Sequence, residues 1–224
     1  MTNPSQAAQT GDREEMTDLQ VKSIEAASET RTEERTQEQR YRSGAYAMLG
    51  RLLRATPDRA VLDQVAGFTR VVGKQDEMTL AMSMLGLAAS TSNPESVDDE
   101  YHALFIGIGR GELVPYGSWY LTGFLMERPL GRLRDDLAAL GFHRQEGVAE
   151  PEDHVAALCE VMAILVDESD QQTQSYFFDR HIKDWMSRFF IDLSEAKSAV
   201  FYRAVGRFGA AFLSLENRYL AMPI

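Results

Sequence analysis

The stretch Glu150–Glu168 reads EPEDHVAALCEVMAILVDE and carries the clearest structural signal in the chain. Its apolar side chains recur at intervals of three, four and seven residues, at Val155, Leu158, Cys159, Met162, Leu165 and Val166. This spacing places them in a single stripe along an α-helix. The stretch therefore predicts an amphipathic helix that begins near Glu150 and buries one face.

The same helical period recurs on both sides of this stretch. Before it, apolar stripes predict helices over residues 40–55, 58–72, 76–89, 95–106 and 127–140, with Asp58 as an N-cap and Gly73 as a stop. After it, they predict two short aromatic-rich helices within 171–191 and a last helix that opens at Ser194 or Glu195. The aromatic side chains expected in the core are Trp185, Phe189, Phe201 and Phe208.

Strand patterns are missing from the sequence, because no run of four or more residues alternates convincingly between apolar and polar side chains. The predicted fold class is therefore all-α, a single bundle of about eight to ten helices.

Residues 1–36 have a different composition from the rest of the chain. They are polar and rich in Glu, Thr, Ser and Gln, with few apolar side chains. Such a segment cannot bury enough apolar surface to fold on its own. We expect a disordered or loosely helical N-terminal extension at residues 1–36, whose role is open, and one all-helical domain at residues 37–224.

Charge and composition narrow the range of partners. The formal net charge is −11 and no basic stripe is visible, which argues against nucleic acid and favours basic peptides. The first residues, MTNPSQAAQT, lack the basic start and apolar core of a secretory signal. No apolar run approaches 18 residues, so we expect a cytoplasmic protein without stable membrane insertion.

A glycine-rich stretch at residues 107–121, GIGRGELVPYGSWYL, predicts a long loop. It is either a functional loop or a simple crossover between two halves of the bundle. Its aromatic side chains are Tyr116, Trp119 and Tyr120, which in a loop line a groove or hold the loop against the core. Tyr101 and Phe105, four residues apart on the preceding helix, are equally consistent with core packing.

The segment Glu150–His154 has two interpretations. As a helix start, it places Pro151 at the first helical position and carboxylates in the first turn, where the helix dipole favours anions. Its charge exceeds what a cap requires, however, and residues 145–179 contain nine acidic side chains and no Lys or Arg. Glu150 and Asp153 could receive a guanidinium group. A metal site is the sharper alternative, although one histidine beside carboxylates supports it weakly.

Signatures of catalysis are missing from the sequence. It contains no phosphate-binding loop and no G-x-S-x-G nucleophile elbow. No two of the four histidines lie three to five residues apart, and Cys159 lies on an apolar stripe, where a core role is expected. We therefore predict a protein that is not an enzyme and has no catalytic residues, metal or cofactor.

Three motifs together resemble the TorD/DmsD/NarJ family of redox-enzyme maturation chaperones. They are an aromatic-x-x-Leu-Phe motif at Tyr101–Phe105, a Pro-x-x-Ser-x-Tyr loop at Pro115–Tyr120, and Glu-Pro-x-Asp-His at Glu150–His154. All three match without departure and in the right order. The resemblance extends over about residues 40–217 and leaves out the first 36 residues.

The resemblance implies a TorD-like helical fold of two halves joined by a hinge loop. It also implies a chaperone that binds the twin-arginine signal peptide and the apo-form of a molybdopterin oxidoreductase until the cofactor is inserted. In the family, the Asp and His of the third motif are associated with signal-peptide recognition, which carries over to Asp153 and His154. The full set of expected client-binding residues is Glu150, Pro151, Asp153, His154, Tyr101, Phe105, Pro115, Tyr116, Ser118, Trp119 and Tyr120.

The client and the assembly stay open at this point. The family serves trimethylamine N-oxide, dimethyl sulfoxide, nitrate and formate enzymes, and a formate dehydrogenase is our weak preference. Family members form monomers or homodimers. Some bind guanine nucleotide, for which this chain offers no phosphate loop.

Two other functions compete with the chaperone hypothesis. The first is a metal-dependent helical hydrolase that uses Glu150, Asp153, His154 and His102. The second is an acidic helical adaptor for a protein other than an oxidoreductase precursor. A bound metal would favour the first, and co-purifying proteins would identify the second.

Overall fold

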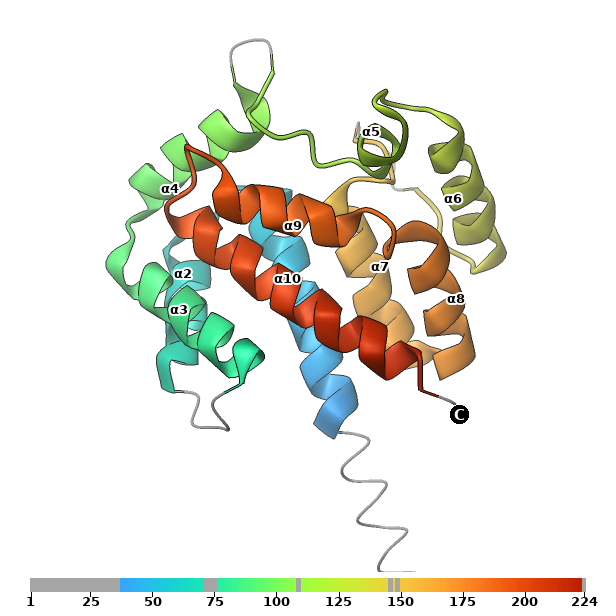
Figure 1. Cartoon of the computed structure of the whole chain (residues 1–224), viewed down its shortest axis with the longest axis horizontal. Helices are drawn as coiled ribbons and strands as arrows, with labels where there is room; N and C mark the ends of the chain where they lie inside the picture. Colours follow the sequence, from blue (N-terminus) through green and yellow to red (C-terminus); the bar gives the residue numbers. More distant parts are fainter. Residues whose placement is uncertain (1–36, 71–75, 108–109, 145–146, 148–149, 223–224) are drawn as a thin grey trace, which may run out of the picture. The chain divides into compact units, whose positions relative to one another are not determined.

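A computed structural model describes residues 37–70, 76–107, 110–144, 147 and 150–222 of the 224-residue chain (Figure 1). Arg42–Ile224 forms one compact unit, and the elements below belong to it. Its described part is helical and contains no strand, which confirms the all-α prediction. The predicted N-terminal extension lies outside the described residues, so the domain boundary at residue 37 stays a prediction.

The helices follow the chain in this order. After the helical residues 42–54 come α2 (Arg59–Ala66), the 3-10 helix η1 (Gly67–Arg70), α3 (Glu77–Thr91), α4 (Pro94–Tyr101) and the π-helix η2 (His102–Ile106). The second half contains α5 (Gly117–Thr122), α6 (Arg128–Ala139), α7 (Val155–Glu168), α8 (Gln171–His181), α9 (Met186–Glu195) and α10 (Phe201–Leu220).

Side-chain caps explain several of the helix starts. Asp58 accepts a hydrogen bond from the backbone N–H of Val61 at 2.8 Å, which confirms it as the N-cap of α2. Asn93 caps α4 in the same way, with Pro94 in the first turn. These caps satisfy backbone donors that have no partner inside the helix. Gly73, the predicted end of the second helix, lies outside the described residues.

The core lies around α9 and α10, which run side by side (Figure 1). Gly209 allows their close approach, because a Cβ at this position would lie 2.3 Å from the ring of Phe190. The predicted core aromatics Trp185, Phe189, Phe201 and Phe208 are all buried. The prediction that these four aromatic side chains belong to the core is therefore confirmed.

Two sequence predictions about helices need correction. The last helix begins at Phe201 rather than at Ser194 or Glu195, because α9 continues to Glu195. In α3, which the sequence predicts as an apolar helix over residues 76–89, Leu80 and Leu87 are exposed, and the buried residues are Ala81, Leu85, Gly86 and Ala89. Helix α3 is apolar on most of its circumference, so its composition does not identify the buried side.

Candidate functional site

The start of α7 differs from the sequence prediction. The helix begins at Val155, and residues 150–153 precede it, so Pro151 is not in its first turn. The N-cap is His154, whose Nδ1 accepts a hydrogen bond from the backbone N–H of Ala156 at 3.2 Å. The capping role expected of the carboxylates at 152 and 153 therefore belongs to the histidine.

Asp153 links the second motif, Pro115–Tyr120, to the third motif, Glu150–His154, through hydrogen bonds. Its Oδ2 accepts a hydrogen bond of 2.7 Å from the backbone N–H of Ser118, and its carbonyl accepts one of 2.9 Å from Gly117. One residue further on, the N–H of Val155 donates to the carbonyl of Pro115 at 2.9 Å. The segment predicted as a loop thus contains the short helix α5, and this helix is held at its start by Asp153.

Asp153 and His154, which the resemblance associates with signal-peptide recognition, are both buried, with exposed fractions of 3% and 4%. Burial, followed by the positive charge of Arg54, lowers the pKa of His154 to about 3, so the ring is neutral at physiological pH. In this structure Asp153 holds the start of α5 and His154 caps α7, and both side chains are buried.

Tyr116 and Glu150 complete this cluster at the start of α7. The rings of Tyr116 and His154 meet edge to face, with 5.0 Å between centroids. Burial, followed by the charge of Glu150 and a hydrogen bond with it, raises the pKa of Tyr116 to about 12. The Glu150 carboxylate itself is about half exposed and lies 3.6 Å from Nε2 of His154.

The other aromatic residues of the loop pack in different directions. Tyr120 donates to the Asp192 carboxylate at 3.1 Å and contacts the rings of Trp185 and Phe189. The ring of Trp119 lies 5.0 Å from the Arg110 guanidinium carbon. Ser118 is fully buried, and its hydroxyl accepts a hydrogen bond from the N–H of Met126.

The first motif also makes tertiary contacts. Tyr101 and Phe105 both pack against Tyr202 of α10, at centroid distances of 5.9 and 5.5 Å. The Tyr101 hydroxyl donates to the carbonyls of Leu53 and Arg54, at the end of the helical residues 42–54. These contacts favour the core-packing interpretation of the pair.

A cavity of about 940 Å³ lies between α6 and α7, beside the third motif. Its apolar wall consists of Leu137, Phe142, Pro151, Ala157, Val161 and Ile164. Its charged wall consists of Arg54, Arg134, Arg144, Glu150, Glu152 and Glu160, and His143 also lines it. Tyr116, Trp119 and Tyr120 are not part of this lining, so the expected groove shared with the loop aromatics is not found here.

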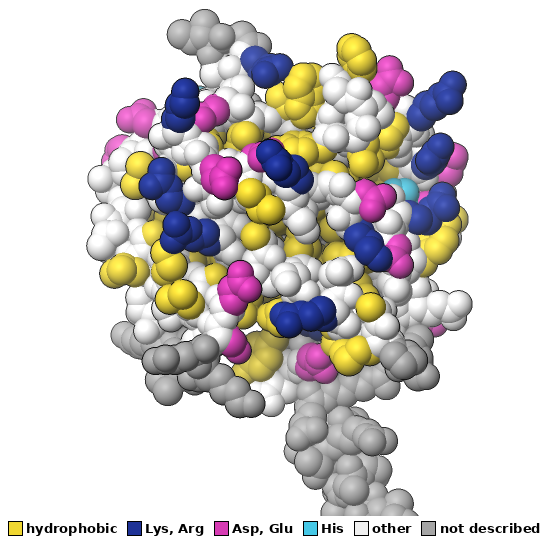
Figure 2. All heavy atoms as spheres, viewed as in Figure 1, with side chains coloured by type: hydrophobic (Ala, Val, Ile, Leu, Met, Phe, Trp, Pro, Cys, Tyr) yellow, Lys and Arg dark blue, Asp and Glu magenta, His cyan; other side chains and the backbone are white. Residues whose placement is uncertain are grey.

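Arginines from other elements neutralise much of the acidic run at residues 145–179. Arg134 of α6 pairs with Glu152 at 2.8 Å, and Arg144 lies 3.7 Å from the same carboxylate. Burial acts to raise the pKa of Glu152, but the hydrogen bond from Arg134, a backbone hydrogen bond and the charges of Arg134 and Arg144 together outweigh it, so the pKa is lowered. Glu150 differs, because no Lys or Arg among the described residues forms an ion pair with it. On the face shown in Figure 2, where α9 and α10 lie in front, positive and negative side chains are interspersed.

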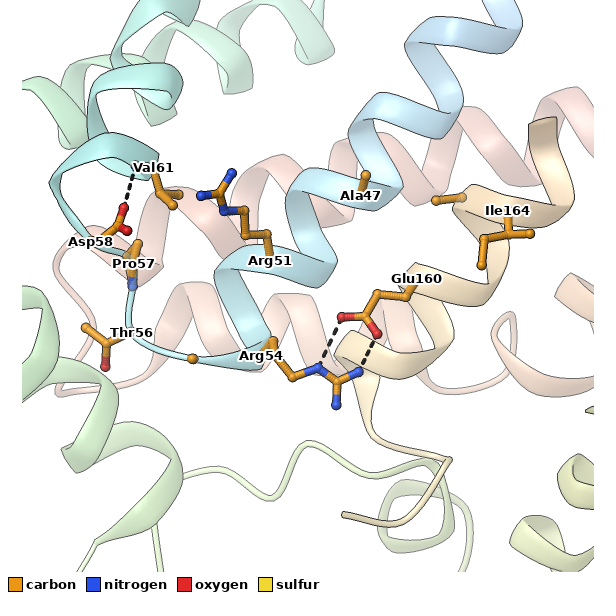
Figure 3. A pocket seen from close by; sticks show the side chains of 11 residues that line it. Ala47, Arg51, Arg54, Thr56, Pro57, Asp58, Val61, Glu160 and Ile164 are labelled. Atoms are coloured by element: carbon orange, nitrogen blue, oxygen red, sulfur yellow. Dashed lines mark hydrogen bonds and ion pairs between the residues drawn. The ribbon is translucent and has the colours of Figure 1, made fainter. Parts of the chain in front are cut away.

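A second cavity, of about 530 Å³, is also lined by the ion pair between Arg54 and Glu160 (Figure 3). Its lining comes from residues 47–61 and from α7, and includes Arg51, Thr56, Asp58 and Ala163. The sequence predicts neither cavity, because Arg54, Arg134 and Glu160 belong to no recognisable motif.

Metal ligation receives no support from the geometry. Across the described ranges, no group of three His, Cys, Asp or Glu side chains is arranged to hold a metal ion. His102, named for the hydrolase hypothesis, is about half exposed, and its Nδ1 lies 2.9 Å from the backbone carbonyl of Asp98. Cys159 is fully buried on the stripe of α7, as predicted, and burial raises the pKa of its thiol.

The chain thus forms an all-helical domain with a cavity between α6 and α7. The family model described as nitrate reductase delta subunit matches residues 73–191, which is more than half of the chain. The chain therefore belongs to this family, and with it to the TorD/NarJ group of chaperones that the three motifs resemble.

Relatives and a solved structure agree with this assignment. The chaperone protein TorD of Vibrio cholerae serotype O1 (strain O395) is 25% identical over 171 residues, covering 68% of this chain and 78% of that protein. The chaperone protein TorD of Shewanella pealeana is 22% identical over 215 residues, covering 88% and 97%. A crystal structure of a candidate redox enzyme maturation protein from Archaeoglobus fulgidus shares the fold, with a TM-score of 0.55 and 18% identity over 77% of this chain and 93% of that one.

These relatives are named as chaperones, which is a non-enzymatic role. The family thus agrees with the prediction that the chain is not an enzyme. In the part of the chain that the structure describes, no helix has the length and apolar character needed to cross a membrane.

Proposed function

We propose that this protein is a cytoplasmic chaperone that binds the twin-arginine signal peptide and the apo-form of a molybdopterin oxidoreductase. It holds the precursor until the cofactor is inserted and export can begin. A formate dehydrogenase is the client class we propose first. The family supports the chaperone role, and the cavity between α6 and α7 supports peptide binding.

The single observation that carries this proposal is the position of Glu150. Its carboxylate is about half exposed on the wall of the 940 Å³ cavity, and no Lys or Arg among the described residues pairs with it. A client guanidinium group can therefore bind it without breaking an existing ion pair. The apolar wall, which includes Leu137, Phe142 and Val161, offers a surface for the apolar stretch that follows the two arginines.

The other motif residues receive positioning roles in this proposal. Asp153 and Ser118 hold the start of α5 against the start of α7, while His154 and Tyr116 flank Glu150. Pro115, Pro151, Trp119 and Tyr120 shape the surrounding loops, and Tyr101 and Phe105 support the helix end that presents Arg54. Replacing Asp153 by Ala would therefore test the fold together with the site.

Isothermal titration calorimetry with a synthetic peptide provides the sharper test. The peptide contains two consecutive arginines followed by a leucine-rich stretch, and the variants are Glu150→Gln and Glu168→Gln. We expect Glu150→Gln to weaken binding by roughly fivefold, since a partly exposed ion pair contributes up to about 1 kcal/mol. Glu168→Gln removes the same charge at the exposed far end of α7 and should bind like the parent.

The peptide provides further controls. Replacing both arginines by lysine keeps the charge but removes the planar fork, and should weaken binding. Added salt should also weaken it, because exposed charges are screened. Equal binding by the parent and Glu150→Gln would reject the proposed acceptor, and no binding by the parent would reject the function.

The client can be identified by affinity purification of the protein from its native cytoplasm, followed by mass spectrometry. Recovery of a formate dehydrogenase precursor is the expected result. Recovery of a different molybdoenzyme precursor would correct the client. Recovery of an unrelated protein, with no precursor, would favour the adaptor hypothesis.

A further inference from the structure

The ion pair between Arg54 and Glu160 already displays the contact that a client arginine would make. Nε of Arg54 donates to Oε1 of Glu160 at 3.1 Å, and Nη2 donates to Oε2, so the guanidinium group binds the carboxylate through two parallel hydrogen bonds (Figure 3). Such bidentate pairs are specific for the planar guanidinium group. Glu160 is therefore a built receptor for an arginine side chain.

Close packing of two helices produces this pair. Gly50 lies against α7, where an added Cβ would be 3.0 Å from Cγ of Glu160 and 3.3 Å from the carbonyl of Ala156. Glu160 therefore contacts Gly50, one helical turn before Arg54, which places its carboxylate within reach of the Arg54 side chain. The position of Arg54 is thus set by backbone packing.

The pair lines both cavities and is partly exposed to solvent. Arg54, Glu160 and Ile164 line both the 940 Å³ and the 530 Å³ cavity. The two side chains are 36% and 43% exposed, so water competes for their hydrogen bonds and breaking the pair costs little free energy. Glu160 is consequently accessible to a competing guanidinium group from the larger cavity.

Glu150 and Glu160 both line the larger cavity, and the charges of both carboxylates act on the Arg54 guanidinium group. The hydrogen bond with Glu160, followed by the charges of Glu160 and Glu150, raises the pKa of Arg54 against the opposing effect of burial. A peptide with two arginines thus meets two carboxylates, one without an arginine partner among the described residues and one occupied by Arg54.

We infer that Arg54 is an internal competitor, which occupies on Glu160 the site of one of the two client guanidinium groups and is displaced when the peptide binds. This inference rests on the proposed function and adds a specificity device to it. A peptide with a single arginine is satisfied by Glu150 and leaves Arg54 in place. Only a second guanidinium group in reach of Glu160 replaces the internal pair.

The test is calorimetry of the same two-arginine peptide with the parent, Arg54→Ala and Arg51→Ala. Arg54→Ala should bind about two- to fivefold more tightly, the factor by which an exposed ion pair typically shifts an equilibrium. Arg51→Ala removes an equal charge from the same helix, but Arg51 lines only the smaller cavity and does not contact Glu160. It should therefore show a much smaller gain.

Two further arms assign the gain to Glu160. The gain in affinity should disappear in the double variant Arg54→Ala/Glu160→Gln. It should also disappear with a peptide whose second arginine is replaced by glutamine. A gain that persists in either arm, or an equal gain in Arg51→Ala, would mean that added space or lost charge is responsible, and the inference would be wrong.

The outcomes separate this inference from the proposed function. If the parent binds the peptide and Arg54→Ala binds it equally or more weakly, Arg54 is not a competitor while the chaperone proposal stands. If neither binds, both proposals fail. Should Arg54→Ala melt below the assay temperature, Arg54→Lys keeps the charge and loses the fork, and an unchanged affinity in that variant would also overturn the inference.

Discussion

At the scale of single residues, His154 is the side chain whose burial has the clearest consequence. Its Nδ1 accepts the backbone N–H of Ala156, so this nitrogen carries no proton and the folded protein holds the neutral ring. Burial, followed by the charge of Arg54, lowers its pKa to about 3 from the usual 6.5. Between about pH 3 and pH 6.5, the unfolded chain therefore binds a proton at this histidine, whereas the folded chain does not.

We predict that folding stability falls as the pH drops below about 6.5, by up to about 1.4 kcal/mol per pH unit from this group. Asparagine is a good N-cap and does not titrate, so His154→Asn should remove this slope while keeping the cap. The measurement is urea denaturation of the parent and the variant between pH 5 and pH 7. His181, whose pKa burial also lowers, contributes equally to both proteins.

His102→Asn provides the control, because this histidine is about half exposed. It should leave the slope of the parent unchanged. If His154→Asn keeps the full slope, His154 takes up its proton normally in the folded state.

At the scale of elements, the start of α10 depends on a carboxylate from another helix. Glu100 of α4 accepts hydrogen bonds from the backbone N–H groups of Val200, Phe201 and Tyr202 at 2.8, 3.0 and 2.7 Å. This buried contact satisfies the first turn of α10 and connects α4 to the core. It explains why α10 begins at Phe201.

We predict that Glu100→Gln lowers the free energy of unfolding by roughly 2–3 kcal/mol, since charged hydrogen bonds are lost and an amide N–H₂ faces backbone donors. Asp99→Asn removes an equal charge from the exposed side of α4 and should change it by less than about 0.5 kcal/mol. Urea denaturation measures both. Equal stabilities for the two variants would contradict the capping role of Glu100.

At the scale of the whole molecule, stability comes from the aromatic core around α10. Phe208 is 1% exposed and stacks on Phe212 and Phe68 at centroid distances of 6.3 and 6.4 Å. We predict that Phe208→Ala lowers the free energy of unfolding by about 3–5 kcal/mol, because the cavity left behind closes only partly. Chemical denaturation at pH 7 provides the measurement.

Val200→Ala is the matched control, since it also shortens an apolar side chain but at a position that is 78% exposed. It should change stability by less than about 0.5 kcal/mol. If Phe208→Ala were equally mild, the assignment of the core face of α10 would be wrong.

The sequence by itself determined the fold class, most helix positions and the aromatic core. Apolar spacing reports which face of a helix is buried, and a cap such as Asp58 acts within four residues of chain, so both are visible locally. The same logic identified Cys159 as a core residue. It failed at α3, where apolar residues surround the helix, and at α10, whose cap comes from another helix.

Only the tertiary structure decided what the charged residues do. The acidic run at residues 145–179 reads as an open binding face, but Arg54 and Arg134 reach it from distant parts of the chain and pair with Glu160 and Glu152. Asp153 is buried and holds the start of α5 through a hydrogen bond, so Glu150 is the accessible carboxylate of the pair. Ion pairs and long-range hydrogen bonds depend on which helices become neighbours, and no periodicity within a single helix encodes that.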